Sequence, residues 1–255
     1  MNKILEMIVI GKNPILETLK SSPKDFNKII FLKTVKPEPR LKEILSLAEE
    51  NGIRRIFLNK FDFEKYFHSK NKKEGIAQGV IGFIKDFEYT PIKKLLEDIE
   101  KIQLPLLLIL DEITDPHNFG AIIRSAVCLG ADGIIIPRHN SVEVNHTVIK
   151  TSSGAVNYIP IAMETNLNNV IKILKQNAYT VIGADILASN TTFEFDFRKP
   201  VCLIIGSEGK GIRKSLRDNC DELVRIPMSG GFNSLNASVS SAVFLYEISR
   251  QKNKV

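Results

Sequence analysis

Residues 106–124, LLLILDEITDPHNFGAIIR, place an uninterrupted apolar run directly before a polar turn and a segment with helical spacing. A run such as Leu106–Leu110, without polar alternation, is typical of a strand that is buried on both faces of a parallel sheet. Residues 133–136, 180–183 and 201–205 have the same character, and segments of helical length separate them. The pattern predicts an α/β domain in which helices cover both faces of a parallel sheet.

The N-terminal third predicts a second, smaller α/β domain. Short apolar strands are expected at 8–10, 28–32, 53–58 and 78–84, with helices at 15–19 and 40–50. Next, residues 86–103 alternate charged residues with a few apolar ones, which predicts a linker containing a helix over Ile92–Ile99. We therefore expect a first domain at 1–85, a linker at 86–103 and a second domain at 104–255.

The positive charge of the chain is concentrated in the first of these domains. Residues 1–85 carry 17 Lys and Arg against 10 Asp and Glu, a net charge of +7, whereas residues 86–255 carry 18 against 19, a net charge of −1. This asymmetry indicates either an electrostatic footprint for a polyanion or a lysine-rich solvated surface. With 44% hydrophobic and 25% charged residues, the 255-residue chain is not collagen-like, disordered or a disulfide-stapled miniprotein.

Cysteine usage and the N-terminus predict a cytoplasmic protein. Cys128, Cys202 and Cys220 lack C-x-x-C spacing, and the first two lie in apolar runs, which is typical of reduced core residues. Residues 1–10 are interrupted by Glu6 and have no small-residue cleavage site, so we expect no signal peptide. No apolar run has the length of a membrane span.

Polar residues after the predicted strands are candidates for a ligand site, because open α/β sheets bind ligands at the carboxyl ends of their strands. Asn118 and Arg124 follow Leu106–Leu110, and a helix beginning near Asn118 would present both; a helix cap plus a surface arginine is the alternative. A loop at 206–213, GSEGKGIR, follows Val201–Ile205. Its glycines suit either close approach to a ligand or a plain tight turn.

A third polar segment precedes the last predicted helix, which runs to about Gln251. Ser234, Asn236 and Ser238 place three small hydrogen-bonding side chains at the start of this helix. One of them would suffice as a helix cap, so the density of such side chains is unusual.

Three common chemistries are not indicated. Neither a P-loop nor a G-x-G-x-x-G pattern follows a strand, which argues against a dinucleotide-dependent oxidoreductase. The G-x-S-x-G elbow of a serine hydrolase is missing from the sequence. We expect no metal, because the histidines lack the spacing of metal ligands; they are His68, His117, His139 and His146.

Taken in order, the three polar segments resemble the three motifs of the SpoU/TrmH family of RNA 2′-O-ribose methyltransferases, part of the SPOUT superfamily. The motif residues are NFGAIIR at 118–124, GSEGKG at 206–211, and IPM at 226–228 with SLNAS at 234–238. The likeness extends over roughly 106–251. In the N-terminal domain, GKNPILE at 11–17 and QGV at 78–80 are similar to the branch that methylates a guanosine of large-subunit 23S rRNA.

The resemblance implies a fold, a cofactor and partners. The fold would be an α/β parallel-sheet domain with a deep C-terminal trefoil knot, preceded by a ribosomal L30-like RNA-binding domain. The knot loops would hold S-adenosyl-L-methionine through backbone groups of Gly206, Ile226 and Leu235. The expected partners are RNA, with rRNA favoured, and a second copy in a homodimer; neither a membrane nor DNA is expected. A tRNA methyltransferase and a non-catalytic RNA-binding or ribosome-assembly protein are the alternatives.

The same resemblance assigns roles to polar residues. Arg124 would activate the ribose hydroxyl as a base, although an arginine pKa above about 12 leaves almost no neutral form. Equally, its cation would bind the adjoining phosphate and stabilise developing alkoxide charge. Asn118 would orient Arg124 and the ribose, and Glu208 would hold the loop or the substrate-side network. Ser234 and Asn236 would supply hydrogen bonds around the reacting centre.

Overall fold

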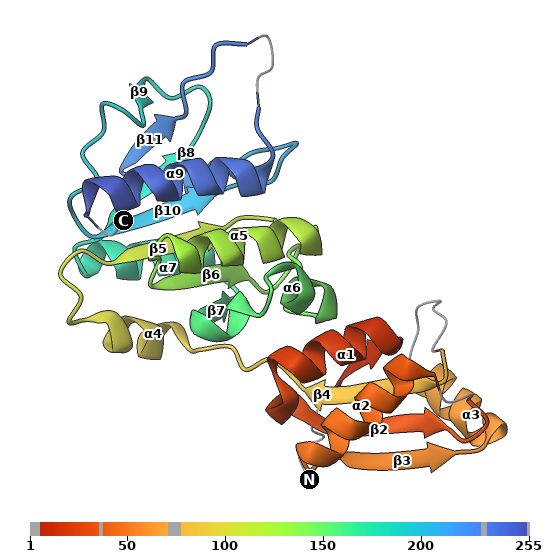
Figure 1. The fold of residues 1–255 in the computed structure, drawn as a ribbon. Coiled ribbons are helices and arrows are strands. Elements are labelled where there is room, and N and C mark those ends of the chain that lie inside the picture. Colours follow the sequence, from red (N-terminus) through yellow and green to blue (C-terminus); the bar gives the residue numbers. More distant parts are fainter. Residues whose placement is uncertain (1–5, 36–37, 71–77, 231–233, 254–255) are drawn as a thin grey trace. The chain divides into compact units, whose positions relative to one another are not determined.

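The computed structural model describes residues 6–35, 38–70, 78–230 and 234–253. The chain forms two compact units that divide between Glu88 and Tyr89 (Figure 1). Both units are of the α/β class, as the sequence predicts.

The first unit is built on a four-stranded sheet with the order β1-β4-β2-β3. Strands β2 and β3 are parallel, and β4 is antiparallel to both β1 and β2. Phe63 and Tyr66 of α3 pack against Ile30 and Phe83 on one face of this sheet. Its elements are β1 (Glu6–Ile10), α1 (Lys12–Ser21), η1 (Pro23–Asp25), β2 (Phe26–Leu32), α2 (Pro39–Glu50), β3 (Arg54–Leu58), α3 (Lys60–Lys70) and β4 (Val80–Lys85).

Most of the segment expected to be a linker belongs to the second unit. The helix is present as predicted, as α4 (Ile92–Ile99). However, Leu95 and Ile99 are buried in the core of the second unit, and the backbone N–H of Thr90 donates to the carbonyl of Ile161. The second unit therefore begins at Tyr89 rather than at residue 104, because the apolar stripe of α4 is packed and not solvated.

Within the described residues, the second unit contains a seven-stranded sheet with the order β7-β6-β5-β10-β8-β11-β9. Each neighbouring pair of strands is parallel, as predicted. Its strands are β5 (Leu106–Leu110), β6 (Gly133–Pro137), β7 (Ile161–Glu164), β8 (Thr180–Ala184), β9 (Asn190–Thr191), β10 (Val201–Ile205) and β11 (Glu222–Arg225). Its helices after α4 are α5 (Pro116–Cys128), α6 (His146–Thr151), η2 (Ala155–Tyr158), α7 (Leu167–Gln176), α8 (Lys214–Arg217) and α9 (Ala237–Gln251).

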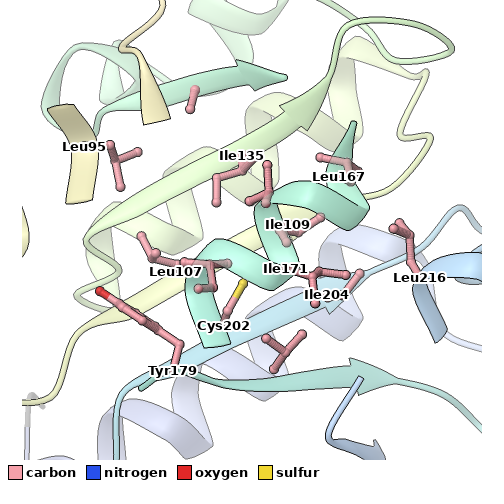
Figure 2. Close-up of a cluster of buried hydrophobic side chains, with 14 of the residues drawn as sticks. Leu95, Leu107, Ile109, Ile135, Leu167, Ile171, Tyr179, Cys202, Ile204 and Leu216 are labelled. Carbon is pink, nitrogen blue, oxygen red and sulfur yellow. The ribbon is translucent and has the colours of Figure 1, made fainter. Parts of the chain in front are cut away.

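One face of this sheet packs against α4, α7 and α8. Figure 2 shows Leu95, Ile171 and Leu216 from these helices in one cluster of buried side chains with Ile109 of β5 and Ile204 of β10. Each of the five is at most 1% exposed. Burial of one such side chain contributes about 1.5–3 kcal/mol to folding, so this layer fixes the strands that carry the loops above them. On the other side, α5 packs against both α6 and α9 (Figure 1).

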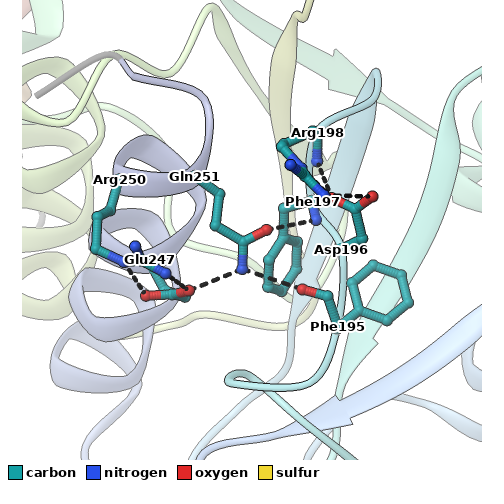
Figure 3. A network of polar contacts seen from close by, with 7 residues as sticks. All are labelled: Phe195, Asp196, Phe197, Arg198, Glu247, Arg250 and Gln251. Carbon is teal, nitrogen blue, oxygen red and sulfur yellow. Dashed lines mark hydrogen bonds and ion pairs between the residues drawn. The ribbon is translucent and has the colours of Figure 1, made fainter.

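A polar network attaches the end of α9 to the segment that leads into β10 (Figure 3). Gln251 accepts a hydrogen bond from the N–H of Phe197 at 2.8 Å and donates to the carbonyl of Phe195 at 3.0 Å. Gln251 also donates to the carboxylate of Glu247 at 2.7 Å. The same carboxylate accepts hydrogen bonds from two nitrogens of the Arg250 guanidinium. The C-terminal end of α9 is therefore held in place, and this fixes the direction of its N-terminal end.

The cysteines are free thiols, but they are not all core residues. Cys202 is fully buried in β10, whereas Cys128, which we expected in the core, is exposed at the end of α5. Its helix position faces away from the sheet although its neighbours in sequence are apolar. Burial raises the pKa of the Cys220 thiol to about 12.

Two further observations concern the described residues as a whole. Across the described ranges, we find no helix with the length and apolar character that a bilayer crossing requires. In the same part of the chain, no group of three or more His, Cys, Asp and Glu residues is arranged to hold a metal ion.

Candidate functional site

The first motif lies at the carboxyl end of β5, at the start of α5. The helix begins at Pro116, two residues earlier than expected, and the side chain of Asp115 caps it by accepting from the N–H of His117 at 3.0 Å. Asn118 is therefore not the helix cap. Its side chain is available for contacts outside its own helix.

Asn118, Glu208 and Asn236 form a hydrogen-bonded cluster that joins the three motifs. Asn118 Nδ2 donates to Glu208 Oε1 at 2.9 Å, and Asn236 Nδ2 donates to Asn118 Oδ1 at 3.0 Å. Asn236 Nδ2 also donates to Glu208 Oε1, which accepts from the N–H of Ala237 at 3.3 Å as well. These residues are 90 and 118 positions away from Asn118 in the sequence, so only the fold brings them together.

Asn236 has two functions in this cluster. Its Oδ1 caps α9 by accepting from the N–H groups of Ser238 at 2.9 Å and Val239 at 3.4 Å. The Ser238 hydroxyl also donates to Oδ1, at 2.6 Å. Because the amide oxygen of Asn236 caps α9, the NH₂ group of the same amide points toward Asn118 and Glu208. The helix cap and the cluster therefore hold the Asn236 side chain in the same orientation.

A cavity of about 430 Å³ lies beside the cluster, at the carboxyl ends of β8, β10 and β11. Its lining includes Gly206, Ile226, Ser234 and Leu235, four residues that the sequence analysis singled out. Segments far apart in the sequence meet there: residues 184–187, 205–212 and 224–226, with Arg217, Met228, Ser234, Leu235, Ala237, Ser240 and Phe244.

The path of the backbone explains why position 206 is a glycine. A Cβ at this position would lie 2.1 Å from the backbone carbon of Gly211 and 2.3 Å from the nitrogen of Ile212. The glycine is therefore required for the loop to fold back over itself, which agrees with the tight turn, one of the two interpretations that the sequence left open. The neck of this loop is closed by a hydrogen bond from the Gly211 N–H to the Ser207 carbonyl at 2.8 Å.

Arg124 lies outside the cluster. Its Nη1 donates to the hydroxyl of Ser153 at 3.3 Å, whereas Asn118, the residue expected to orient it, is bonded to Glu208. The reason is helical geometry, since six residues span about 1.7 turns and direct the two side chains to different sides of α5. Gly120 lies on the same side of α5 as Arg124, and a Cβ there would be 2.7 Å from Thr151. The helix therefore lies directly against the turn that carries Ser153.

Two ion pairs near the cavity were not found by the sequence analysis. Asp185 pairs with Arg217 at 3.0 Å, and both line the cavity. Asp111 pairs with Arg213, and the hydrogen bonds to this carboxylate raise the pKa of the Arg213 guanidinium. A signal was present for both acids, because Asp111 directly follows the predicted strand at 106–110 and Asp185 lies two residues after the one at 180–183, where ligand sites form.

The cluster and the cavity define a class of protein, and comparison with known families identifies it. Residues 105–246 match the SpoU rRNA Methylase family, and residues 8–90 match the domain described as RNA 2'-O ribose methyltransferase substrate binding. The chain belongs to the SpoU family of RNA methyltransferases.

Individual relatives are similar in sequence to this chain over nearly its whole length. A protein of Bacillus subtilis (strain 168), provisionally named TrmH family tRNA/rRNA methyltransferase YacO, is 37% identical over 97% of this chain and 96% of its own length. The 23S rRNA (guanosine-2'-O-)-methyltransferase RlmB of Pectobacterium atrosepticum is 32% identical over 96% of this chain and 98% of its own length.

Among solved structures, the SpoU methyltransferase AviRb of Streptomyces viridochromogenes, in complex with the cofactor AdoMet, is similar to this chain. Its TM-score is 0.72 at 25% identity, over 97% of this chain and 91% of AviRb. The fold expected from the sequence resemblance is thereby confirmed at the level of the α/β SpoU architecture.

Proposed function

We propose that this chain transfers a methyl group from S-adenosyl-L-methionine to the ribose 2′-hydroxyl of a guanosine in 23S rRNA. The observation that carries the proposal is the cluster of Asn118, Glu208 and Asn236 beside the cavity, which unites the three motifs in one place. The similarity to RlmB over both units supports the rRNA substrate. A tRNA substrate is the second candidate, because YacO carries the name tRNA/rRNA methyltransferase.

The cavity has the chemistry that S-adenosyl-L-methionine needs. Its volume of about 430 Å³ lies in the range of small-molecule sites, about 300–1,000 Å³. Ile186, Leu187 and Ile226 supply apolar surface for a planar base, and the backbone of the glycine-rich loop supplies polar groups. In our proposal Gly206, Ile226 and Leu235 hold the adenosine through their backbone. The bound cofactor supplies a methyl group on a sulfonium sulfur.

In our proposal the chain after β10 forms a deep trefoil knot, as the family resemblance implies. The segment after β10 and the segment between β11 and α9, which both line the cavity, would belong to this knot. Knots are nearly absent from other folds, so strand order alone does not predict one.

Transfer to a 2′-hydroxyl requires removal of its proton and an in-line approach, so positioning is the main task of the protein. We assign Arg124 to the ribose side, as a cation that binds the adjoining phosphate and stabilises alkoxide charge, because a guanidinium keeps its proton at neutral pH. The proton of the 2′-hydroxyl would then leave to the phosphate or to water, as the methyl group moves from the sulfonium sulfur to the oxygen. Glu208 and Asn118 hold the substrate-side network together, while Ser234 and Asn236 offer hydrogen bonds at the edge of the cavity.

The first unit supplies the RNA-binding surface in this proposal, as an L30-like domain. It matches the substrate-binding domain of the family, and residues 1–85 hold a net charge of +7. Phosphate neutralisation by such a domain provides affinity that falls with salt. A cytoplasmic location, where RNA substrates and reduced thiols occur together, is consistent with the free cysteines.

A homodimer is the proposed active form. Val239, Val243 and Tyr246 lie on one side of α9 and are 47%, 38% and 55% exposed. With Ala121 and Ser125 of α5, they line a shallow apolar depression directly next to the third motif. Exposed apolar patches of this kind mark interaction sites, and a second copy would cover this one with the same surface.

The decisive experiment compares two RNA substrates. The purified chain is incubated with S-adenosyl-L-methionine and either transcribed 23S rRNA or a tRNA pool, and 2′-O-methylated nucleotides are mapped. We expect one modified guanosine in 23S rRNA. Modification confined to tRNA would establish the second candidate, and no modification of either RNA would refute the proposed activity.

A further inference from the structure

Asp111 is a buried charged residue at the end of β5. Its side chain is 0% exposed, yet it lies next to the loop that lines the cavity. Its carboxylate accepts two hydrogen bonds from Arg213, from the backbone N–H at 2.8 Å and from Nε at 2.7 Å, and it forms an ion pair with Nη2 at 2.6 Å. A buried carboxylate is costly unless it is fully paired, and these contacts supply that pairing.

The position of Asp111 connects both ends of the loop at 206–212. The backbone N–H of Asp111 donates to the carbonyl of Ile205 at 2.8 Å, the last residue of β10 before the loop. The Asp111 carboxylate holds Arg213, the first residue after the loop. One residue directly after β5 therefore fixes the beginning and the end of the segment that carries Glu208.

We propose that Asp111 is a positioning residue for the methyl transfer, acting through Arg213 on the loop at 206–212. The clamp places Glu208 against Asn118 and gives the cavity wall its shape. The proposal rests on the function proposed above, because it assigns the loop to the cofactor and the reacting centre. It adds Asp111 and Arg213, which lie outside the Asn118, Glu208 and Asn236 cluster, to the residues that the reaction needs.

Strand β5 offers a matched control at its opposite end. The carboxylate of Asp132 accepts from the N–H of Leu106 at 2.7 Å, at the amino end of the same strand. Both acids tie β5 to a neighbouring segment, but only Asp111 is attached to the cavity loop. If Asp111 served stability alone, its loss and the loss of Asp132 would have the same kind of effect.

The experiment compares Asp111→Asn with Asp132→Asn in the full chain. Unfolding temperatures are measured first, and activity is then assayed well below the lower one. For Asp111→Asn we expect a roughly tenfold or larger rise in the Kd for S-adenosyl-L-methionine and a roughly tenfold or larger fall in kcat, because charge-assisted hydrogen bonds that fix the loop are lost. For Asp132→Asn we expect both values within about twofold of wild type, even where its unfolding temperature falls.

A double variant provides a readout that a purely structural residue would not change. If Asp111 acts through the loop, the losses in kcat/KM of Asp111→Asn and Glu208→Gln should not multiply in the double variant, since both disturb one unit. Multiplicative losses would overturn the inference. So would a folded Asp111→Asn protein with the cofactor affinity and kcat of wild type.

Two further controls separate the possible failures. Should Asp111→Asn not fold, Arg213→Lys keeps the charge and the backbone N–H but loses the forked contact, and wild-type cofactor affinity and kcat in that variant would overturn the inference. A wild-type chain that neither binds S-adenosyl-L-methionine nor methylates RNA would instead refute the proposed function.

Discussion

Replacing Gly206 by alanine should open the cavity loop and abolish cofactor binding. The added Cβ would lie 2.1 Å and 2.3 Å from the backbone carbon and oxygen of Gly211 and 2.3 Å from the nitrogen of Ile212. Ordinary carbon contacts are about 3.5–4.0 Å, so one backbone segment must retreat by more than about 1 Å. No side-chain rotation can relieve the clash, since all three atoms belong to the main chain.

The size of the effect follows from what this retreat disrupts. Overpacking of a tight site costs about 1–3 kcal/mol, and loss of the hydrogen bond from Gly211 to Ser207 adds about 0.5–1.5 kcal/mol. We expect a loss of about 2–4 kcal/mol in the free energy of unfolding. For a unit of this size, that corresponds to a fall in unfolding temperature of roughly 10 °C.

Gly209→Ala is the matched control, because it lies in the same loop and a Cβ there has nothing within 4 Å. Its effect on the free energy of unfolding should stay within about 0.5 kcal/mol. Thermal unfolding and calorimetry with S-adenosyl-L-methionine, on protein stripped of bound cofactor, provide the two measurements. The reasoning is refuted if Gly206→Ala matches Gly209→Ala in both unfolding temperature and cofactor affinity.

Arg124→Ala should abolish methyl transfer but leave cofactor affinity within about twofold, because Arg124 reaches Ser153 and is not a lining residue of the cavity; calorimetry showing a much weaker affinity would contradict this. Residues 89–255 alone should fold and bind cofactor but bind RNA at least about tenfold more weakly, and equal RNA affinity in a filter assay would oppose the role given to the first unit. Tyr246→Asp should yield monomers in analytical ultracentrifugation, because a charge would enter the proposed interface; an unchanged dimer would place the interface elsewhere. At about pH 8, exposed Cys128 should react with iodoacetamide and Cys220 should not, because burial raises the Cys220 pKa to about 12; equal labelling by mass spectrometry would contradict that.

Sequence pattern and structure agree best where apolar patterning is strong. The runs at Leu106–Leu110 and Val201–Ile205 are the central strands β5 and β10, and the helix over Ile92–Ile99 is present with those bounds. Shorter elements were missed: β7 and β11 have four residues each, too few for a periodic signal. The packing of α4 into the core could not be predicted from the sequence either, because an amphipathic helix has the same apolar pattern in a linker and on a sheet.

The site could be predicted only in part, for a geometric reason. Asn118, Glu208 and Asn236 were all named, but nothing in the sequence shows that one amide caps α9 and bonds both of the other residues. In the structure Asn118 bonds to Glu208 and Arg124 to Ser153, because side chains six positions apart point to different sides of a helix; the role of Asn118 in orienting Arg124 and the ribose stays a prediction.

By itself, the sequence determined the fold class, the positive charge of the N-terminal third and the family, since each of these depends on residue type, spacing or order along the chain. The tertiary structure decided which residues meet. Asp111 lies 102 positions before Arg213, and Gly206 is needed because the backbone at Gly211 passes within 2.3 Å of where its Cβ would be. Such contacts arise when parallel strands far apart in the sequence end at one edge of a sheet, and local patterns contain no information about those distances.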